Sequence, residues 1–287
     1  MKRLLALLLV SALFAVACGE DDAPVENTTS EAPERIVSLS PTATEILFAI
    51  GAGDQVVAVD QFSNYPENAP FSDLDGFQVN VEAVAAYDPQ VVVMQSTGGE
   101  EGLEALGITV LVQDSPADLE GIYAQIEEIG AATGNEAGAA DLVAEMRDRI
   151  DELVADAPDA SGLRYYHELG EDYYSLNSDS FVAQVYGLFG LVSIGDDAAG
   201  EAFDGYLPLA EEFILEADPD LIFLADTIWA GQTAETVAAR PGWADLTAVQ
   251  TGAVVELNDD VASRWGPRVV EFVEAIAAVL DEVSVPA

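Results

Sequence analysis

Two stretches of the chain, one in each half, share a pattern that constrains the fold more than any other feature. They are "EAVAAYDPQVVVM", which starts at Glu82, and "EFILEADPDLIFL", which starts at Glu212. Each begins with glutamate, reaches Asp-Pro six residues later and ends in an apolar run. Asp-Pro ends a helix and starts a strand, because the residue before proline disfavours helical backbone. The same helix–strand unit in both halves predicts two similarly built lobes.

Apolar strands alternate with helices along both halves, which predicts an α/β fold with parallel sheets in two Rossmann-like lobes and a ligand cleft between them. A helix over 136–157, about 33 Å long at 1.5 Å per residue, is expected to join the lobes as one rigid connector. The expected domains are an N-terminal lobe at 35–134, the connector at 135–158 and a C-terminal lobe at 159–287. Strands are expected at 35–39, 56–59, 91–94, 110–112, 164–168, 221–224 and 254–257, and further helices at 119–131, 180–189 and 268–283.

The stretch "SLSPTATEILFAIG" after the first strand predicts a helix that ends at Gly51. Two N-caps compete for it. Thr42 with Glu45 has the form of a capping box, whereas Ser40 followed by Pro41 places proline at the first helical position. The amides of this helix start either face a polar ligand group at the lip of the cleft or serve only a well-capped helix.

The chain begins with a positive pair and an apolar run, Leu4 to Val16, that is short for a membrane span. This predicts a signal peptide over 1–18. Its end, "AVAC", resembles the lipobox of bacterial lipoproteins, which implies that Cys18 carries a lipid; the alternative is an ordinary signal peptide with an incidental cysteine. Residues 19–34 are acidic and polar, which is typical of a flexible tether. We therefore expect an extracytoplasmic protein that meets the membrane through its lipid anchor only.

The charge of the chain excludes several partners. It has 53 Asp plus Glu against 9 Lys plus Arg, a formal net charge of −44. Nucleic acid binding is not expected, because phosphate contacts need cations, and a polyanionic ligand would be repelled. Most of the carboxylates are interpreted as a solvated acidic surface.

Enzymatic signatures are missing from the sequence, which has neither a G-x-S-x-G elbow nor a phosphate loop with lysine. His167, the only histidine, lies in an apolar strand. It is interpreted as a strand histidine facing a cleft or the interior, and the alternative is an axial ligand for a metal macrocycle. An exported hydrolase or metal-dependent enzyme and a surface adhesion lipoprotein remain rival functions.

Aromatic residues gather just after the expected strands or in loops. In parallel sheets this edge is where ligands bind, so the set favours a broad apolar ligand surface. Arg264, in "SRWGPR" after the last strand, could bind one anionic group. The aromatic set is Phe62, Tyr65, Phe77, Tyr173, Tyr174, Tyr206, Trp229 and Trp265.

Together these features resemble the substrate-binding proteins of ABC importers, in the class that serves vitamin B12, haem and iron-siderophore complexes, with the vitamin B12 binders nearest. The stretch "RIVSLSPTATEILFAIGAGDQVVAVDQFSNYP" is similar to the opening of that class, and "WADLTAVQTGAVVEL" and "RWGPR" are similar to its C-terminal lobe. The resemblance extends from Arg35 to about Val283. It implies a permease and its ATPase as partners.

The resemblance also implies roles for single residues. Phe62, Tyr174, Tyr206 and Arg264 fall at ligand positions, Phe77 falls near one, and Gln95 stands where vitamin B12 binders carry tryptophan; Tyr65 and Trp229 complete the candidate ligand set. In the family, one surface glutamate on each lobe pairs with arginines of the permease. Glu82 and Glu212 match those positions, and the alternative is that they are ordinary solvated helix acids.

The predicted function is capture without chemistry, by a monomer with no cofactor of its own and little closure between its lobes. Burying several negative charges would require paired cations, and only Arg264 is well placed. This weighs against catecholate siderophores and favours a corrinoid such as cobalamin or a near-neutral hydroxamate iron chelate. Haem is the further alternative, bound through a tyrosine such as Tyr174 or through His167.

Overall fold

The computed structural model of the protein describes residues 32–282, which form one compact unit. The predicted signal peptide with Cys18 and most of the predicted tether lie outside the described residues. Two parallel sheets build this unit, as the alternation of strands and helices predicted.

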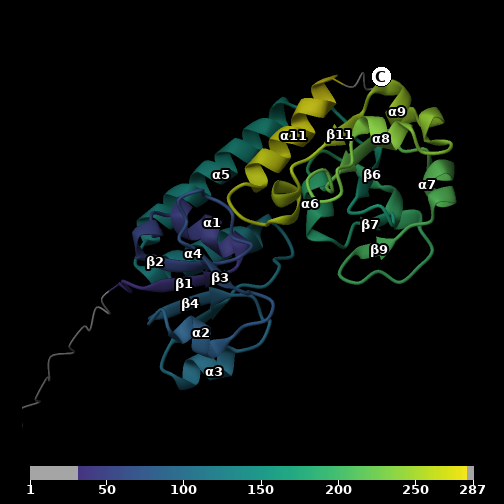
Figure 1. The fold of residues 1–287 in the computed structure, drawn as a ribbon. Coiled ribbons are helices and arrows are strands. Elements are labelled where there is room, and N and C mark those ends of the chain that lie inside the picture. The colour runs from purple at the N-terminus through teal and green to yellow at the C-terminus, as the bar shows by residue number, and fades with distance from the viewer. Residues whose placement is uncertain (1–31, 283–287) are drawn as a thin grey trace, which may run out of the picture. The chain divides into compact units, whose positions relative to one another are not determined.

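The first sheet has five parallel strands in the order β3-β2-β1-β4-β5, with helices on both faces (Figure 1). Alternation along β4 divides its side chains between two cores: Val91 and Val93 join the core with α1, α4 and α5, whereas Val92 and Met94 join the core with α2 and α3. The elements are β1 (Ile36–Leu39), α1 (Pro41–Ala49), β2 (Val56–Asp60), β3 (Phe71–Leu74), α2 (Val81–Ala85), β4 (Val91–Met94), α3 (Glu100–Ala105), β5 (Thr109–Val112), α4 (Leu119–Thr133) and α5 (Glu136–Asp156).

The second sheet has four parallel strands in the order β11-β10-β6-β8, beside an antiparallel ribbon of β7 and β9. Neighbouring tyrosines of β6 point to opposite faces: Tyr165 packs on Tyr186 and Phe223, and Tyr166 packs on Trp243. The elements are β6 (Arg164–Glu168), β7 (Tyr174–Leu176), α6 (Phe181–Gly187), β8 (Val192–Ser193), β9 (Tyr206–Pro208), α7 (Glu211–Ala217), β10 (Leu221–Leu224), α8 (Ala234–Ala238), α9 (Thr247–Thr251), β11 (Val254–Glu256), α10 (Asp259–Ser263) and α11 (Val269–Glu282).

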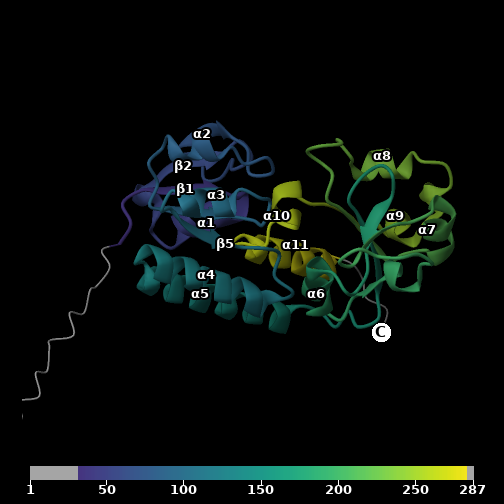
Figure 2. The ribbon, with the colours of Figure 1, turned by 90° about the horizontal axis from the view of Figure 1, so that it is seen from below.

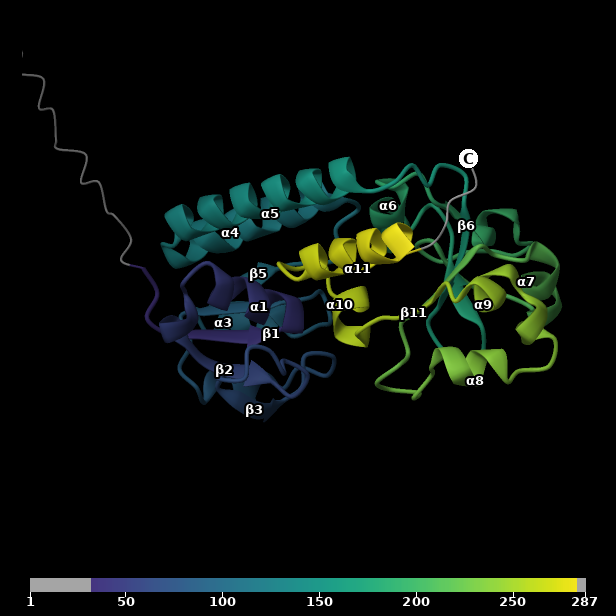
Figure 3. The same ribbon diagram turned by 90° about the horizontal axis from the view of Figure 1, so that it is seen from above.

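Helices α5 and α11 lie side by side and connect the two sheets through one hydrophobic core (Figures 1 and 3). Helix α5 buries Val143, Met146 and Ile150, while Phe272 of α11 contacts Tyr186 of the second sheet's core. On the surface of the seam Arg149 pairs with Glu274 at 2.8 Å. The long helix predicted at 136–157 is therefore present as Glu136–Asp156, and helix α11 packs along it as a second connection between the sheets.

The internal repeat is reproduced in the structure at the level of single residues. Helices α2 and α7 carry Glu82 and Glu212 at their second position, and both side chains are exposed. After each helix the aspartate adopts a left-handed backbone, with φ 50° at Asp88 and 44° at Asp218. The same local geometry twice confirms that the two halves share one building unit.

The first helix corrects one of the two predicted caps. Ser40 is the N-cap, since its hydroxyl accepts a hydrogen bond from the amide of Ala43 and Pro41 is the first helical residue. The capping box of Thr42 and Glu45 is wrong. Thr42 lies inside the helix, and the carboxylate of Glu45 accepts hydrogen bonds from Arg264 and Arg268 instead. A distant ion pair has replaced the local partner.

A close approach between α5 and the end of α1 allows a test of how these two helices pack. A Cβ at Gly138 would lie 2.1 Å from the carbonyl oxygen of Ile50, so Gly138→Ala must push α5 away from the end of α1. We expect a loss of about 1–3 kcal/mol in the free energy of unfolding, as for other overpacked sites, measured by urea denaturation.

The control is Gly187→Ala in α6, where an added Cβ meets nothing within 4 Å. This variant should be neutral or gain up to about 1 kcal/mol, because alanine favours helix. Equal stability of the two variants would contradict the packing described here.

Candidate functional site: the cavity between the two sheets

The loops that follow the strands of both sheets carry most of the predicted ligand residues. Phe62, Phe77 and Gln95 follow β2, β3 and β4 of the first sheet, whereas Trp229 and Arg264 follow β10 and β11 of the second. The carboxyl ends of parallel strands are where such folds place ligands. Helix α10, which leads to Arg264, lies beside the start of α11 (Figure 2).

Two of the predicted aromatic residues contact each other in the loops of the first sheet. Phe62 and Phe77 meet edge to face, with ring centroids 5.3 Å apart, and both are exposed. The loop that carries Phe62 is held by a hydrogen bond that the Ser63 hydroxyl donates to Asp60 at 2.6 Å. Burial raises the pKa of the Asp60 carboxyl.

A second tie joins the loops after β3 and β4. The Thr97 hydroxyl donates to the carbonyl oxygen of Gly76 at 2.7 Å. Gly76 has no room for a side chain, since a Cβ there would lie 2.4 Å from the carbonyl oxygen of Leu39. Gln95 is half-buried in the same loop as Thr97, so these contacts place it beside the segment that carries Phe77.

Tyr206 lines two adjoining cavities, of about 340 and 470 Å³, which we call the interlobe cavity. Tyr174 shares its face of the β7–β9 ribbon, because Leu176 pairs with Tyr206 and side chains alternate along a strand. Ser115 joins from the loop between β5 and α4, so segments of both halves form the walls. The remaining lining residues include Phe181, Phe203, Trp265 and Arg264.

Phe181 and Phe203 of this cavity were missed in the sequence. Phe181 is the first residue of α6 after its cap Ser180, and Phe203 is 77% exposed in the loop before β9. A position just after a helix cap is a signal that could have found Phe181. Phe203 gave none, because it follows no strand of the second sheet. Tyr173 of the predicted aromatic set stacks on Trp243 instead, at 5.8 Å between ring centroids.

Of the eight predicted ligand residues, only Tyr206 and Arg264 line the interlobe cavity. The other six are outside its lining: Phe62, Tyr65, Phe77, Gln95, Tyr174 and Trp229. Tyr65 lines a different hollow, of about 450 Å³, where the guanidinium of Arg268 lies 4.4 Å above its ring. Trp229 is 78% exposed, and its loop is shaped by Asp259, whose carboxylate accepts hydrogen bonds from the amides of Thr227, Ile228 and Trp229. The aromatic candidates therefore do not all share one hollow.

Arg264, the predicted cation of the site, is already paired. Its guanidinium donates to Glu45 at 2.9 Å and to Asp260 at 2.8 Å, and also to the side chain of Asn64 at 2.8 Å. Glu45 accepts two more hydrogen bonds from Arg268, at 2.9 and 3.0 Å. We call Glu45, Asp260, Arg264 and Arg268 the charge cluster. Its two carboxylates balance its two guanidiniums.

A second buried polar group lies at the edge of the other sheet. Glu168 is fully buried and accepts two hydrogen bonds from Arg240, each at 2.6 Å. Asp226, only 3% exposed, follows β10, and neither of its oxygens has a hydrogen-bond partner within residues 32–282. Burial, reinforced by the charge of Glu168, raises the pKa of Asp226 to about 7.

His167 lies inside the second sheet and has no solvent exposure. Its Nδ1 is 2.8 Å from the hydroxyl of Tyr186, and burial lowers the pKa of the imidazole to about 3, so the ring is neutral. Within residues 32–282 no group of three or more His, Cys, Asp or Glu is placed to hold a metal ion. The same residues contain no helix with the length and apolar character of a membrane span.

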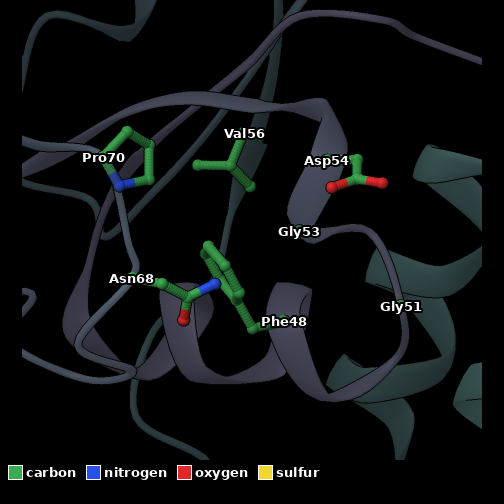
Figure 4. Close-up of a pocket in the computed structure, with 7 residues that line it drawn as sticks. All are labelled: Phe48, Gly51, Gly53, Asp54, Val56, Asn68 and Pro70. Carbon is green, nitrogen blue, oxygen red and sulfur yellow. The ribbon is translucent and has the colours of Figure 1, made fainter.

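A pocket of about 440 Å³ lies elsewhere, at the end of α1 (Figure 4). Phe48 stands beneath Val56, with Pro70 and Asn68 on one side and Asp54 on the other. The pocket is lined by none of the predicted ligand residues, and Asp54 is its only charged group. It is therefore separate from the candidate site.

The family model for the periplasmic binding proteins matches residues 36–261. A cobalamin-binding protein of Halobacterium salinarum is 34% identical over 257 residues, which cover 85% of this chain and 68% of that protein. An uncharacterized ABC transporter substrate-binding lipoprotein of Bacillus subtilis is 30% identical over 270 residues, covering 90% and 83%. The crystal structure of the periplasmic vitamin B12-binding protein of Vibrio cholerae is similar, with 28% identity and a TM-score of 0.71 over 87% of this chain and 97% of that one.

The buried carboxyl of Asp226 predicts a pH effect on stability. Because its folded pKa of about 7 is above its usual value of 3.8, the folded state holds a proton that the unfolded state has lost. Stability from this group is complete below pH 4 and falls as the pH rises toward 7. Asp226→Asn should remove this fall, with a gain at pH 8 of up to about 4 kcal/mol.

Urea denaturation at pH 5 and pH 8 measures the effect. The control is Asp73→Asn on the exposed side of β3, which removes one carboxylate without burial. The same pH dependence in wild type and Asp226→Asn would show that this carboxyl titrates normally.

Proposed function

Because this chain belongs to the periplasmic binding protein family, we propose that it captures a corrinoid, cobalamin above all, and delivers it unchanged to an ABC permease with its ATPase. The interlobe cavity is the observation that carries the proposal. Aromatic and apolar side chains of the second half form most of its walls, and Ser115, Pro116 and Ala117 of the first half complete them. A large ring system with an apolar face suits such a surface. The cobalamin-binding relative supports the same guest.

Charge narrows the choice of guest. Arg264 is the one arginine of residues 32–282 that lines the interlobe cavity, and it is already paired with Asp260 and with Glu45, which it shares with Arg268. A guest with several negative charges would find no free cation there and would also meet the field of a chain with net charge −44. This supports a corrinoid or a near-neutral iron hydroxamate over a catecholate chelate.

Haem would need an axial ligand from the protein. His167 cannot reach a guest without unfolding of β6, because the side chain is buried and bonded to Tyr186. Tyr206 and Tyr174 are the tyrosines at the cavity face. Haem is therefore an outcome to be measured beside cobalamin, through a tyrosinate ligand only.

No chemical step belongs to the proposal. The neutral, buried His167 lacks the access that a general base needs, and hydrolysis would leave the guest altered before transport. The chain acts as a receptor whose walls come from both lobes, on the extracytoplasmic side of the membrane. Anchoring through Cys18 and action as a monomer complete the proposal.

Glu82 and Glu212 are proposed to dock the permease. They occupy equivalent positions on α2 and α7, and both are exposed. Each helix is followed by an aspartate with left-handed backbone, so the local geometry is the same in both halves. An acidic side chain on each half can pair with basic residues of a two-fold permease. Neither glutamate is among the lining residues of the interlobe cavity, so docking and capture use separate surfaces.

Titration of the mature protein with cyanocobalamin in a calorimeter tests the guest. We expect submicromolar binding, and Tyr206→Ala should weaken it about tenfold, or 1.4 kcal/mol, because an aromatic wall is lost. Phe71→Ala removes an exposed ring on the outer strand β3 and should leave affinity unchanged. Binding of haemin or a ferric hydroxamate without binding of cyanocobalamin would reassign the guest.

Transport into proteoliposomes that contain the cognate permease and ATPase tests docking. The double variant Glu82→Ala, Glu212→Ala should lose most transport while it keeps the affinity for cyanocobalamin, because its cavity is intact. The matched control is Glu101→Ala with Glu216→Ala, which removes two exposed acids from α3 and α7. Equal transport by both double variants would contradict the docking role.

A further inference from the structure

The charge cluster joins parts of the chain that are far apart in sequence, and Glu45 is its centre. Helix α1 supplies Glu45, whose side chain is 1% exposed, and the segment between α10 and α11 supplies both arginines. A buried carboxylate is stable only when cations compensate it. The guanidiniums of Arg264 and Arg268 provide that compensation, because a nitrogen of each lies 2.9 Å from Oε1 of Glu45.

The compensation also works in the other direction, because Glu45 cancels positive charge at the wall of the interlobe cavity. Arg264 lines that cavity while its side chain is 10% exposed. Asp260 supplies the second carboxylate of the cluster, and its other oxygen accepts from Asn64 at 2.8 Å. With two carboxylates and two guanidiniums, the cluster presents no net charge to a guest.

We propose that Glu45 is a specificity-determining residue, which neutralises Arg264 and Arg268 so that the interlobe cavity discriminates against anionic guests. This inference rests on the proposed function, since it concerns the guest of the same cavity. Glu45 acts on the guest through Arg264 and not by contact. Its removal should leave one uncompensated positive charge next to the cavity, where a carboxylate of a guest could pair with it.

The experiment compares two guests that differ by one charge. They are cyanocobalamin and a cobalamin monocarboxylic acid, in which one side-chain amide of the corrin is a carboxylate. The wild-type protein is expected to bind the acid more weakly than the amide. In Glu45→Gln, which keeps the shape of the side chain, the ratio of the two dissociation constants should fall about tenfold.

A charge-balanced variant separates this role from a structural one. Glu45→Gln combined with Arg268→Gln leaves Arg264 paired with Asp260, so the discrimination of the wild type should return. Asp260→Asn removes the other carboxylate and keeps the buried Glu45, so it should shift the ratio in the same direction as Glu45→Gln. This second variant tests the proposal even if Glu45→Gln does not fold. Glu104→Gln on α3 changes the net charge equally at an exposed site and should not alter the ratio.

Each outcome decides between the two proposals. Binding of cyanocobalamin with an unchanged ratio in both Glu45→Gln and Asp260→Asn would overturn the role of Glu45 and leave the corrinoid receptor standing. The absence of binding of either corrinoid to the wild type would overturn the corrinoid receptor and, with it, this inference. A shift that Glu104→Gln reproduces would assign the discrimination to the overall charge of the chain and also overturn the role of Glu45.

Discussion

Burial of the Glu45 carboxylate is the constraint on which the arrangement around the cavity depends. A carboxylate removed from water needs cations and hydrogen bonds, and here both come from Arg264 and Arg268 near the C-terminal end of the chain. The same guanidinium of Arg264 donates to Asn64 and to the carbonyl oxygen of Phe62, both in the loop after β2. The interaction that compensates the charge of Glu45 therefore also joins distant parts of the chain and holds the loop after β2.

The apolar seam of α5 and α11 adds a second constraint of a different kind. Its side chains belong to one hydrophobic core that continues from the first sheet to the second. Rotation of one sheet against the other would have to expose part of that core to water, at about 25 cal/mol for each Å² of apolar surface. This favours an interlobe cavity of nearly fixed width, which suits a bulky and rigid guest, over lobes that close around a small one.

The sequence predicted the buried strands and the long helices, but not the contacts between them. Buried strands such as Val91–Met94 are continuous apolar runs, which is a strong local signal for a strand. Strands β3, β7, β8 and β9 were missed because they are only two to four residues long. The short helices α3, α8, α9 and α10 were also missed. At the candidate site the sequence found Tyr206 and Arg264 from their place in the chain. It missed Phe181 and Phe203, and nothing in the local pattern indicated that the other six predicted ligand residues lie outside the lining of the same cavity.

The sequence by itself determined the two-lobed plan, because period and punctuation are local: the helix, the Asp-Pro and the apolar run recur in each half, and the structure reproduces them down to the left-handed Asp88 and Asp218. It also determined that positive charge would be scarce. Only the tertiary structure decided how that scarce charge is used. Glu45 has a local partner in the sequence pattern and a different one in the fold, since a buried carboxylate is satisfied by whatever cation the packing brings to it and not by its neighbours along the chain.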